Sequence, residues 1–292
     1  MSNLATHTAT KAIVEKYGFN FTKSLGQNFL VDGNILRKIV DGADIGSDDI
    51  VFEIGTGIGT LTSELARRAK KVVAIEIDSR LIPILSETLS EFDNVEIINQ
   101  DILKVDLPAL VREHSPDQKI KVVANLPYYI TTPIIMRFLE EGIALSSMVI
   151  MIQKEVADRI AAKPSTKAYG SLSVAIQYYA DSRIIAKAPK GAFVPPPNVD
   201  SSVLRIDVKQ DKGVDLMDSD LFFEVVKGSF SKRRKTILNS LSTYGDFEKE
   251  IIEKALEASG IDPKRRGETL TILEFASLSN QIYCLRRETP DK

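Results

Sequence analysis

The sequence is poor in the residues that most often bind metal ions or form covalent cross-links. It has a single cysteine, Cys284, and only two histidines, His7 and His114, among 292 residues. One cysteine excludes an intrachain disulfide framework and a cysteine-rich zinc site. The two histidines are far apart and lie in polar surroundings, which argues against a histidine-based triad or zinc site. We therefore expect no metal centre.

Long apolar runs are also missing. No stretch reaches the ~18 consecutive apolar residues of a membrane span, and the N-terminal "MSNLATHTATKAIVEKYG" has no apolar core of a signal peptide. We expect a soluble cytoplasmic protein with no membrane partner, and nothing demands more than a monomer. The formal net charge is only -2, so any polyanion must be bound by local basic clusters.

From about residue 48 onward, short apolar runs alternate with helical stretches. This alternation is typical of an α/β fold with a doubly wound parallel sheet. The predicted strands are 49–54, 71–75, 95–99, 119–124, 147–152, 183–188 and 202–208. The predicted helices between them are 60–69, 79–89, 132–141 and 154–161.

The pattern changes after residue 209. A polar, turn-rich segment over 210–220 reads as a linker, and the helices expected beyond it are 221–230, 235–241, 247–259 and 271–286. We therefore predict an α/β domain over 1–209, with an N-terminal extension at 1–47, and a small all-helical domain over 221–292.

A glycine-rich loop, "GTGIG", separates the first of these strands from the helix that follows. Its glycines permit positive φ and close approach of a ligand, but the G-x-G-x-G spacing places Thr60 where the dinucleotide fingerprint has its third glycine. Glu53 precedes the loop, and its negative charge would repel a pyrophosphate bound there. A positively charged cofactor would suit that carboxylate better.

Acidic residues end the next two strands. Glu76 lies about twenty residues beyond the loop, where a carboxylate can bind both hydroxyls of a ribose. Asp101, or the amide beside it, can meet an adenine, although an aspartate there also fits a helix N-cap. Acids at the carboxyl ends of neighbouring strands predict a nucleoside pocket at the switch point of the sheet. From the loop alone, a tight turn or an NAD site stays open.

The stretch "NLPYY" follows the fourth strand and contains no nucleophile or strong acid or base. Asn125 offers a side-chain oxygen and Leu126 a backbone carbonyl, Pro127 fixes the turn, and Tyr128 offers a ring for stacking. Two acceptors and a stacking ring suit an exocyclic amine such as adenine N6. With a sulfonium as electrophile, catalysis would rest on positioning and charge stabilisation. Taken alone, the stretch also fits an ordinary turn between strand and helix.

Several longer motifs accompany these features. They are "QNFL" (27–30), "FEIGTGIGTLT" (52–62), "AIEID" (74–78), "NQDIL" (99–103), "NLPYYITTP" (125–133), "MIQKEVADRI" (151–160) and "FVPPPNVDSSV" (193–203). Together they resemble the ribosomal RNA adenine N6-dimethyltransferases over residues 26–270, and most closely the KsgA/RsmA branch. That branch uses S-adenosylmethionine to dimethylate two adjacent adenosines in the terminal hairpin loop of small-subunit rRNA.

The resemblance implies a Rossmann-like class I methyltransferase sheet, a C-terminal helical RNA-binding domain, and the immature 30S subunit as partner. The cofactor-binding residues that it implies are Asn28, Leu30, Glu53, Gly55, Gly57, Glu76, Ile77, Asp101, Ile102 and Asn125. The catalytic residues that it implies are Asn125, Leu126, Pro127, Tyr128 and Phe193. Among these, Tyr128 and Phe193 would sandwich the target base, with Phe193 held as a platform by the proline run after it.

Basic residues cluster in two segments near the C-terminus. Flipping out an adenine costs a few kcal/mol and stacking returns roughly 1–3 kcal/mol, so phosphate contacts must supply the remaining affinity. The residues predicted to make those contacts are Lys232, Arg233, Arg234, Lys235, Lys264, Arg265 and Arg266. The "KRRK" run alone also fits a solvated helix start.

Two further interpretations of the family resemblance stay open. One is an Erm-type enzyme that methylates large-subunit rRNA and confers macrolide resistance; the basic segments and the proline-rich loop favour the small-subunit branch. The other is an assembly checkpoint that acts mainly by binding, which is compatible with catalysis. An NAD oxidoreductase is disfavoured by the glycine spacing and by the lack of an acid or base for hydride transfer.

Overall fold

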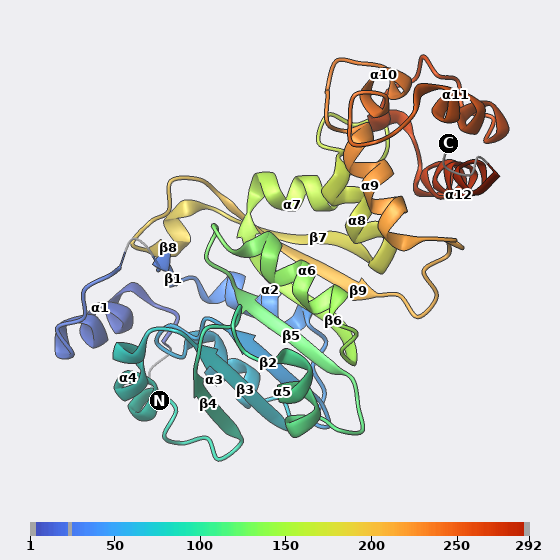
Figure 1. Cartoon of the computed structure of the whole chain (residues 1–292). Coiled ribbons are helices and arrows are strands. Elements are labelled where there is room, and N and C mark those ends of the chain that lie inside the picture. The colour runs from blue at the N-terminus through green and yellow to red at the C-terminus, as the bar shows by residue number, and fades with distance from the viewer. Residues whose placement is uncertain (1–3, 23–24, 289–292) are drawn as a thin grey trace. The chain divides into compact units, whose positions relative to one another are not determined.

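The computed structural model describes residues 4–22 and 25–288. Its internal contacts divide the chain into two compact units. The sheet unit comprises residues up to Ala157 together with Ser182–Val208, and the helical unit comprises Asp158–Asp181 together with the residues from Lys209 onward. Figure 1 shows the strands in the first unit and a group of helices in the second.

Within the described residues, the sheet unit carries a seven-stranded sheet in the order β4-β3-β2-β5-β6-β9-β7. Strands β2 to β6 pair in parallel, and β9 runs antiparallel to β6. The strands lie within a few residues of their predicted ranges, which confirms the α/β class. They are β2 (Ile50–Ile54), β3 (Lys71–Glu76), β4 (Val95–Asn99), β5 (Ile120–Asn125), β6 (Leu145–Gln153), β7 (Ala180–Ala188) and β9 (Ser201–Val208).

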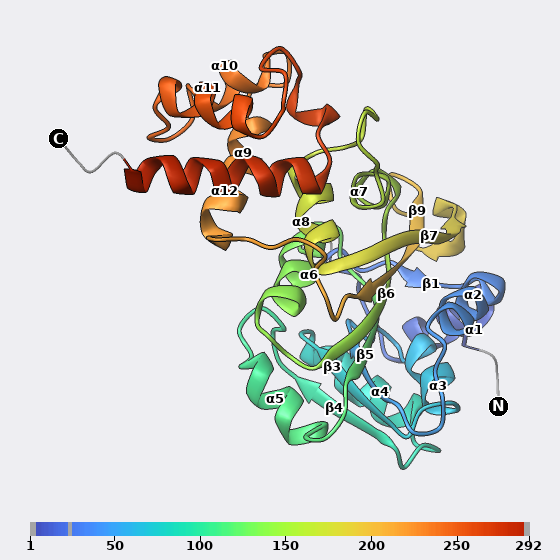
Figure 2. The same cartoon turned by 90° about the vertical axis from the view of Figure 1, so that its right-hand side faces the viewer.

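Helices cover both faces of this sheet. Figure 2 shows α2 (Gly33–Gly42) and α3 (Thr60–Ala66) on one face, with α5 (Leu107–His114) and α6 (Thr131–Glu140) on the other. The central strands are mostly apolar for this reason, and every residue of β2 is buried, including Glu53 near its carboxyl end. Each fully buried aliphatic side chain stabilises the unit by roughly 1.5–3 kcal/mol.

Smaller elements complete the sheet unit. Strands β1 (Phe29–Leu30) and β8 (Phe193–Val194) form an antiparallel pair in which Leu30 faces Phe193. The other helices of this unit are α1 (His7–Lys16), the short 3₁₀ turns Ser79–Leu81 and Lys190–Ala192, and α4 (Ile82–Thr88). The division between the units falls within α7 (Lys154–Ile160), after Ala157. Neither α1, α2 nor α5 was predicted from the sequence.

The helical unit surrounds an apolar core of its own. Phe222, Val225, Leu256 and Phe275 are completely buried in it. The side chain of Asp218 caps the first helix after the sheet by accepting from the Leu221 amide. The helices are α8 (Ser171–Tyr179), α9 (Ser219–Ser229), α10 (Ile237–Leu241), α11 (Lys249–Ala258), the 3₁₀ turn Gly267–Thr269 and α12 (Ile272–Glu288).

The observed division differs from the predicted boundary at residue 209. Residues 158–181, expected in the α/β domain, belong to the helical unit, because α8 buries Val174 and Tyr178 in the same core as Phe222. Helix α8 was missed because its apolar residues lie all round it, which hides the helical period.

The expected linker at 210–220 is also more structured than predicted. The Lys212 ammonium lies 4.4 Å from the centre of the Tyr178 ring. Asn280 on α12 accepts from the Met217 amide and donates to the Asp215 carbonyl. The segment is therefore bound to the helical unit along its length, and does not form a free connection.

Candidate active site

A cavity lies at the carboxyl edge of the sheet, where the strand order reverses between β2 and β5. The structure brings together in its lining all but one of the residues predicted to bind the cofactor or to act in catalysis. They are Asn28, Leu30, Glu53, Gly55, Gly57, Glu76, Ile77, Asp101, Ile102, Asn125, Leu126, Pro127 and Tyr128.

The glycine loop is bound to the strand beside it through one carboxylate. Glu76 accepts from the Gly57 amide at 3.1 Å and the Thr56 hydroxyl at 3.2 Å through one oxygen, and from the Asp78 amide at 2.9 Å through the other. Gly57 has φ +58°, and a Cβ there would lie 3.1 Å from the Phe29 ring, so only glycine fits. Glu76 is 5% exposed and its burial raises its pKa. The loop and the acid are thus held in fixed positions at the cavity wall.

Glu53, at the end of β2, is the most unusual group in the cavity. It is 1% exposed, and neither carboxylate oxygen has a hydrogen-bond partner of good geometry among the described residues. Burial raises its pKa to about 8, with a smaller lowering by the Thr62 hydroxyl and a smaller raising by Glu76. A buried acid without a partner is costly for the free protein. A cationic group placed in the cavity would be stabilised by this carboxylate and would stabilise it in turn.

The third wall of the cavity is a turn that follows β4. One oxygen of Asp101 accepts from the Leu103 amide at 3.0 Å, so Asp101 caps this turn. Arg137, on α6, donates to the carbonyls of Ile102 and Val105 and so fixes the position of this turn. Arg137 was not found from the sequence because it lies more than thirty residues beyond the turn that it supports.

Apolar side chains flank the same turn. Ile77 is 49% exposed and Leu103 is 37% exposed, although both are large aliphatic residues that line the cavity. Exposed aliphatic groups in the lining of a cavity give an apolar surface that suits a flat ring. Together with Asp101, they give this wall the composition expected of an adenine site.

The "NLPYY" turn is fixed by contacts on both sides. Asn125 donates its Nδ2 to the Asn28 carbonyl at 3.0 Å, which leaves its Oδ1 as an acceptor. The Leu126 amide donates to the Met151 carbonyl of β6 at 3.2 Å. The Tyr128 hydroxyl bonds Ser201 of β9 at 2.6 Å, and burial raises its pKa, so the hydroxyl stays neutral. The turn therefore offers hydrogen-bond acceptor oxygens and the fixed ring of Tyr128. It offers no side chain suited to proton transfer.

Some lining residues were missed by the sequence reasoning. Tyr129 lines the cavity and is 57% exposed, but the interpretation of "NLPYY" named only Tyr128. Gln27 donates to Asp78 at 2.7 Å and so joins the segment before β1 to the strand end beside Glu76. Gly26, at φ +60°, allows that segment to approach Pro127. Only the "QNFL" motif signalled this segment.

Phe193 corrects the sequence-based assignment. It does not line the cavity and is only 2% exposed, because β8 pairs with β1 and the Phe193 ring packs into the core with Leu30. The expected exposed platform is therefore not formed at this position. The aromatic residues that line the cavity are Phe29, which is only 6% exposed, and Tyr128 and Tyr129.

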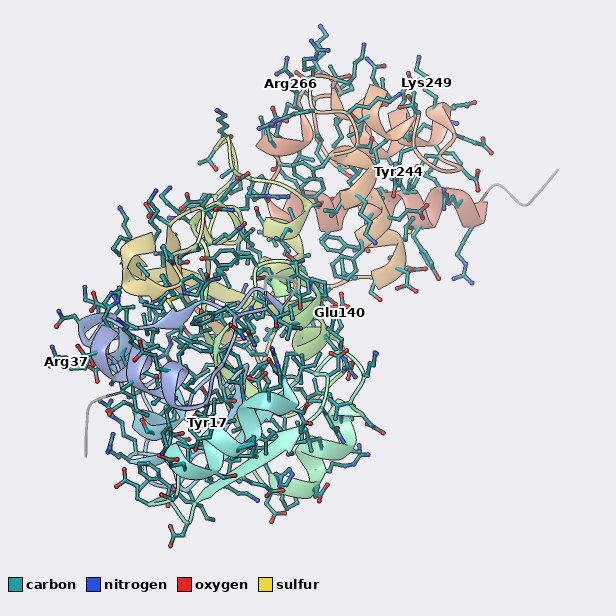
Figure 3. The ribbon with its side chains drawn as sticks, turned by 90° about the vertical axis from the view of Figure 1, so that its left-hand side faces the viewer. Tyr17, Arg37, Glu140, Tyr244, Lys249 and Arg266 are labelled. Atoms are coloured by element: carbon teal, nitrogen blue, oxygen red, sulfur yellow. The ribbon has the colours of Figure 1, made fainter. Side chains whose placement is uncertain are left out.

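The predicted basic residues lie on the helical unit. Lys232–Lys235 are exposed in the turn between α9 and α10, so they do not start a helix as their sequence also allowed. Lys264 and Arg266 are exposed as well, and Arg266 is visible at the surface of this unit in Figure 3. Arg265 is different, because its guanidinium pairs with Glu274 and donates to the Thr269 carbonyl. We therefore assign Arg265 a structural role within the unit.

The described residues contain no group of three or more His, Cys, Asp or Glu side chains placed to bind a metal ion. No helix in the described part of the chain combines the length and apolarity needed to cross a bilayer. The polar groups of the cavity are carboxylates, hydroxyls, backbone groups and side-chain amides, which suits hydrogen-bonded recognition of a nucleoside.

Comparison with known proteins agrees with this geometry. The chain is 56% identical over 282 residues to ribosomal RNA small subunit methyltransferase A of Clostridioides difficile, covering 97% of this chain and 98% of that protein. It is 58% identical to the protein of the same name from Geobacillus kaustophilus, covering 96% and 97%.

Solved structures show the same fold. A dimethyladenosine transferase from Plasmodium falciparum superposes with a TM-score of 0.73 at 28% identity, covering 86% of this chain and 95% of that one. The 23S rRNA methyltransferase ErmE superposes with a TM-score of 0.67 at 27% identity, covering 88% and 100%. The family described as ribosomal RNA adenine dimethylase matches residues 18–283. This chain is a member of the ribosomal RNA adenine dimethylase family.

Proposed function

We propose that the protein transfers methyl groups from S-adenosylmethionine to N6 of two adjacent adenosines in the 3'-terminal hairpin loop of small-subunit rRNA, in the immature 30S subunit. It does so as a monomer and without a metal ion. The observation that carries this proposal is the free acceptor oxygen of Asn125 beside the cavity, on a turn that holds no nucleophile. The small-subunit name of relatives at 56–58% identity supports the choice of RNA.

S-adenosylmethionine is the methyl donor that the family and the fold imply. Glu76 would bind its ribose, and Asp101 with the apolar surface beside it would bind its adenine. Glu53 would face its positively charged part, which would give this buried carboxyl the partner that it lacks. When bound, this cofactor supplies a methyl group carried on a sulfonium. The leaving group is then a neutral thioether, so its departure requires no proton donor.

The target amine would lie between the two acceptors of the "NLPYY" turn. The Asn125 Oδ1 and the Leu126 carbonyl would accept hydrogen bonds from the two N–H groups of this amine. These bonds would direct the nitrogen lone pair towards the methyl group. Positive charge develops on that nitrogen during transfer, and oxygens already fixed in place stabilise it without reorganisation. Tyr128, held by Ser201, would stack on the flipped base.

The experiment that tests this function is transfer of a labelled methyl group to unmethylated small subunits, with the modified nucleoside identified by mass spectrometry. We expect N6,N6-dimethyladenosine at two adjacent positions. The same assay on large-subunit RNA tests the Erm-type alternative, which the 27% identity to ErmE supports less well than the closer relatives support the small subunit. Methylation of large-subunit RNA alone would overturn the proposal.

An Asn125→Ala variant separates catalysis from an assembly checkpoint. The variant should bind small subunits and transfer no methyl group. Rescue of the growth of a deletion strain by this variant would show that binding is the dominant role in the cell. Failure to rescue would show that methylation itself is required.

A further inference from the structure

A third basic segment lies on the helical unit, beside the two that the sequence identified. It is the loop 163–167, "KPSTK", between α7 and α8. Its two lysines, Lys163 and Lys167, are exposed, and it contains no acidic residue. The sequence reasoning placed this loop in the α/β domain and gave it no role. Its membership of the helical unit changes which residues it neighbours.

Hydrogen bonds hold this loop against both of the other basic segments. The Ser165 amide donates to the Glu268 carbonyl at 2.7 Å, which joins the loop to the turn after Arg266. The Arg233 guanidinium donates to the Lys167 carbonyl at 3.3 Å, which joins the loop to the "KRRK" turn. The loop therefore touches both segments, each through its own contact.

The other two segments also contact each other. The Ile237 amide, just after the "KRRK" turn, donates to the Arg265 carbonyl at 2.7 Å. A Cβ on Gly267 would lie only 2.7 Å from the Ser229 carbonyl, so the absence of a side chain there is required for the close approach of these turns. Three segments far apart in the sequence thus form one continuous surface.

The charge on this surface is strongly positive. None of its exposed lysines forms an ion pair among the described residues. The acids beside it are Glu268, 4.0 Å from Arg266, and Asp262, which accepts from the Lys264 amide at 2.8 Å. Asp218 caps the start of α9, and Asp220 and Glu224 lie in its first half, whereas the "KRRK" turn follows its end. The unit is therefore polarised. The exposed cations of the surface are Lys163, Lys167, Lys232, Arg233, Arg234, Lys235, Lys264 and Arg266.

We infer that Lys163 and Lys167 complete a single phosphate-binding surface, together with the "KRRK" turn and the Lys264–Arg266 turn, and that its ligand is the sugar-phosphate backbone of rRNA. This inference rests on the proposed function for the identity of the polyanion. Exposed lysines on a rigid loop act as point charges that neutralise phosphates and release bound counterions on association. They contribute affinity and salt dependence without reading sequence.

The test is binding of unmethylated small subunits by a Lys163→Gln/Lys167→Gln variant over a range of salt concentrations. Glutamine keeps the backbone carbonyl that Arg233 uses, so the loop stays anchored. We expect affinity to fall about 3- to 10-fold, and the slope of log affinity against log salt to fall by roughly 1.4–1.8 for two lost phosphate contacts. A Lys167→Arg variant should retain the affinity of the unmodified protein.

The matched control is a Lys249→Gln/Lys254→Gln variant. These lysines lie on α11 of the same unit and pair with Glu253 and Glu250, and Figure 3 shows Lys249 and Arg266 at different places on its surface. The control should bind subunits as the unmodified protein does. Cofactor binding, measured for every variant, reports on folding of the sheet unit.

Three results would overturn the inference. The first is unchanged affinity and salt slope in the loop variant while an Arg233→Glu/Arg234→Glu variant binds weakly, which leaves the proposed function intact. The second is weakened binding with an unchanged salt slope, because a lost phosphate contact must alter the slope. The third is weakened binding to subunits but not to the protein-free rRNA, which would indicate a ribosomal protein as the ligand. Failure of the unmodified protein to bind any rRNA would instead remove the proposed function.

Discussion

The cavity of the sheet unit and the basic surface of the helical unit differ in how their polar groups are held. In the cavity Glu53 and Glu76 are buried and Asn125 is half-buried, and backbone contacts fix the oxygens of Glu76 and the amide of Asn125. On the basic surface, Lys232 and its neighbours are exposed, and few have a partner. Fixed, buried groups give geometric selectivity that salt hardly affects, whereas exposed charges give affinity that salt removes. The two regions should therefore fail differently when altered.

The largest effect is expected in the cavity, from Asn125→Ala. In the proposed mechanism, loss of the amide oxygen removes one of the two acceptors that stabilise charge on the target nitrogen, so kcat should fall roughly 10²- to 10³-fold. Binding of small subunits and its salt dependence should be retained. Single-turnover methyl transfer and subunit binding, measured on the same preparation, check both. A variant that loses subunit binding as severely as turnover would contradict the comparison between the two regions.

The next effect is expected on the basic surface, from Arg233→Glu/Arg234→Glu. Reversing two charges should weaken rRNA binding by more than tenfold at low salt and lower the salt slope by at least about 1.4. Cofactor affinity should not change. Filter binding across a salt series, with calorimetry for the cofactor, makes the measurement. A Lys249→Glu/Lys254→Glu variant, which changes charge equally on α11, serves as control. Equal loss of cofactor and rRNA binding would indicate a folding defect.

A smaller, pH-dependent effect is expected from Glu53→Gln. Because burial raises the pKa of Glu53 from its ordinary 4.5 to about 8, the folded chain keeps a proton that the unfolded chain loses, and stability falls as pH rises between those values. Glutamine does not titrate, so the variant does not lose stability in this way as pH rises. Its Tm should therefore exceed that of the unmodified protein by more near pH 8 than near pH 5. Its cofactor affinity should fall about tenfold, or ~1.4 kcal/mol, because the positive charge of the cofactor loses the carboxyl that it would ionise on binding.

Thermal melts with and without S-adenosylmethionine measure both consequences of Glu53→Gln. Glu140→Gln, at an exposed position visible in Figure 3, is the control and should change neither Tm nor affinity. A lower Tm for the Glu53 variant at both pH values would show that this carboxyl has a stabilising partner in the free protein.

The smallest effect is expected from Arg137→Ala, at the edge of the cavity. Loss of its charged hydrogen bonds to the Ile102 and Val105 carbonyls should lower the free energy of unfolding by about 1–3 kcal/mol and loosen the turn of the adenine site. The KM for S-adenosylmethionine should rise several-fold while kcat changes little. Arg37→Ala, an exposed arginine that bonds only its neighbour Asn34 among the described residues, is the control. A fall in kcat without a change in KM would place Arg137 elsewhere in the reaction.

The sequence predicted the sheet better than it predicted the surface of the protein. Strands with both faces covered are mostly apolar, so an acid at or just beyond the end of a strand interrupts the pattern visibly, and Glu53, Glu76 and Asp101 were found by position. The turn at Asn125 was found because an amide, a proline and an aromatic ring rarely follow such a strand.

Contacts between distant segments were beyond that reasoning. Pairing of β1 with β8 buries Phe193, and nothing in the residues near Phe193 reports the partner strand. Arg265 looks like its basic neighbours until Glu274 is brought beside it. The loop at Lys163 joined the helical unit because of hydrogen bonds to residues about 70 and 100 positions further along the chain. These features depend on tertiary structure that local patterns do not record.

The most direct test is a crystal structure of the protein with adenosine and an unreactive analogue of S-adenosylmethionine. The account predicts the analogue against the glycine loop, with the adenosine N6 within hydrogen-bond distance, about 3 Å, of both the Asn125 Oδ1 and the Leu126 carbonyl. An adenosine amine bound elsewhere, with those two oxygens turned away from the sulfonium position, would contradict it.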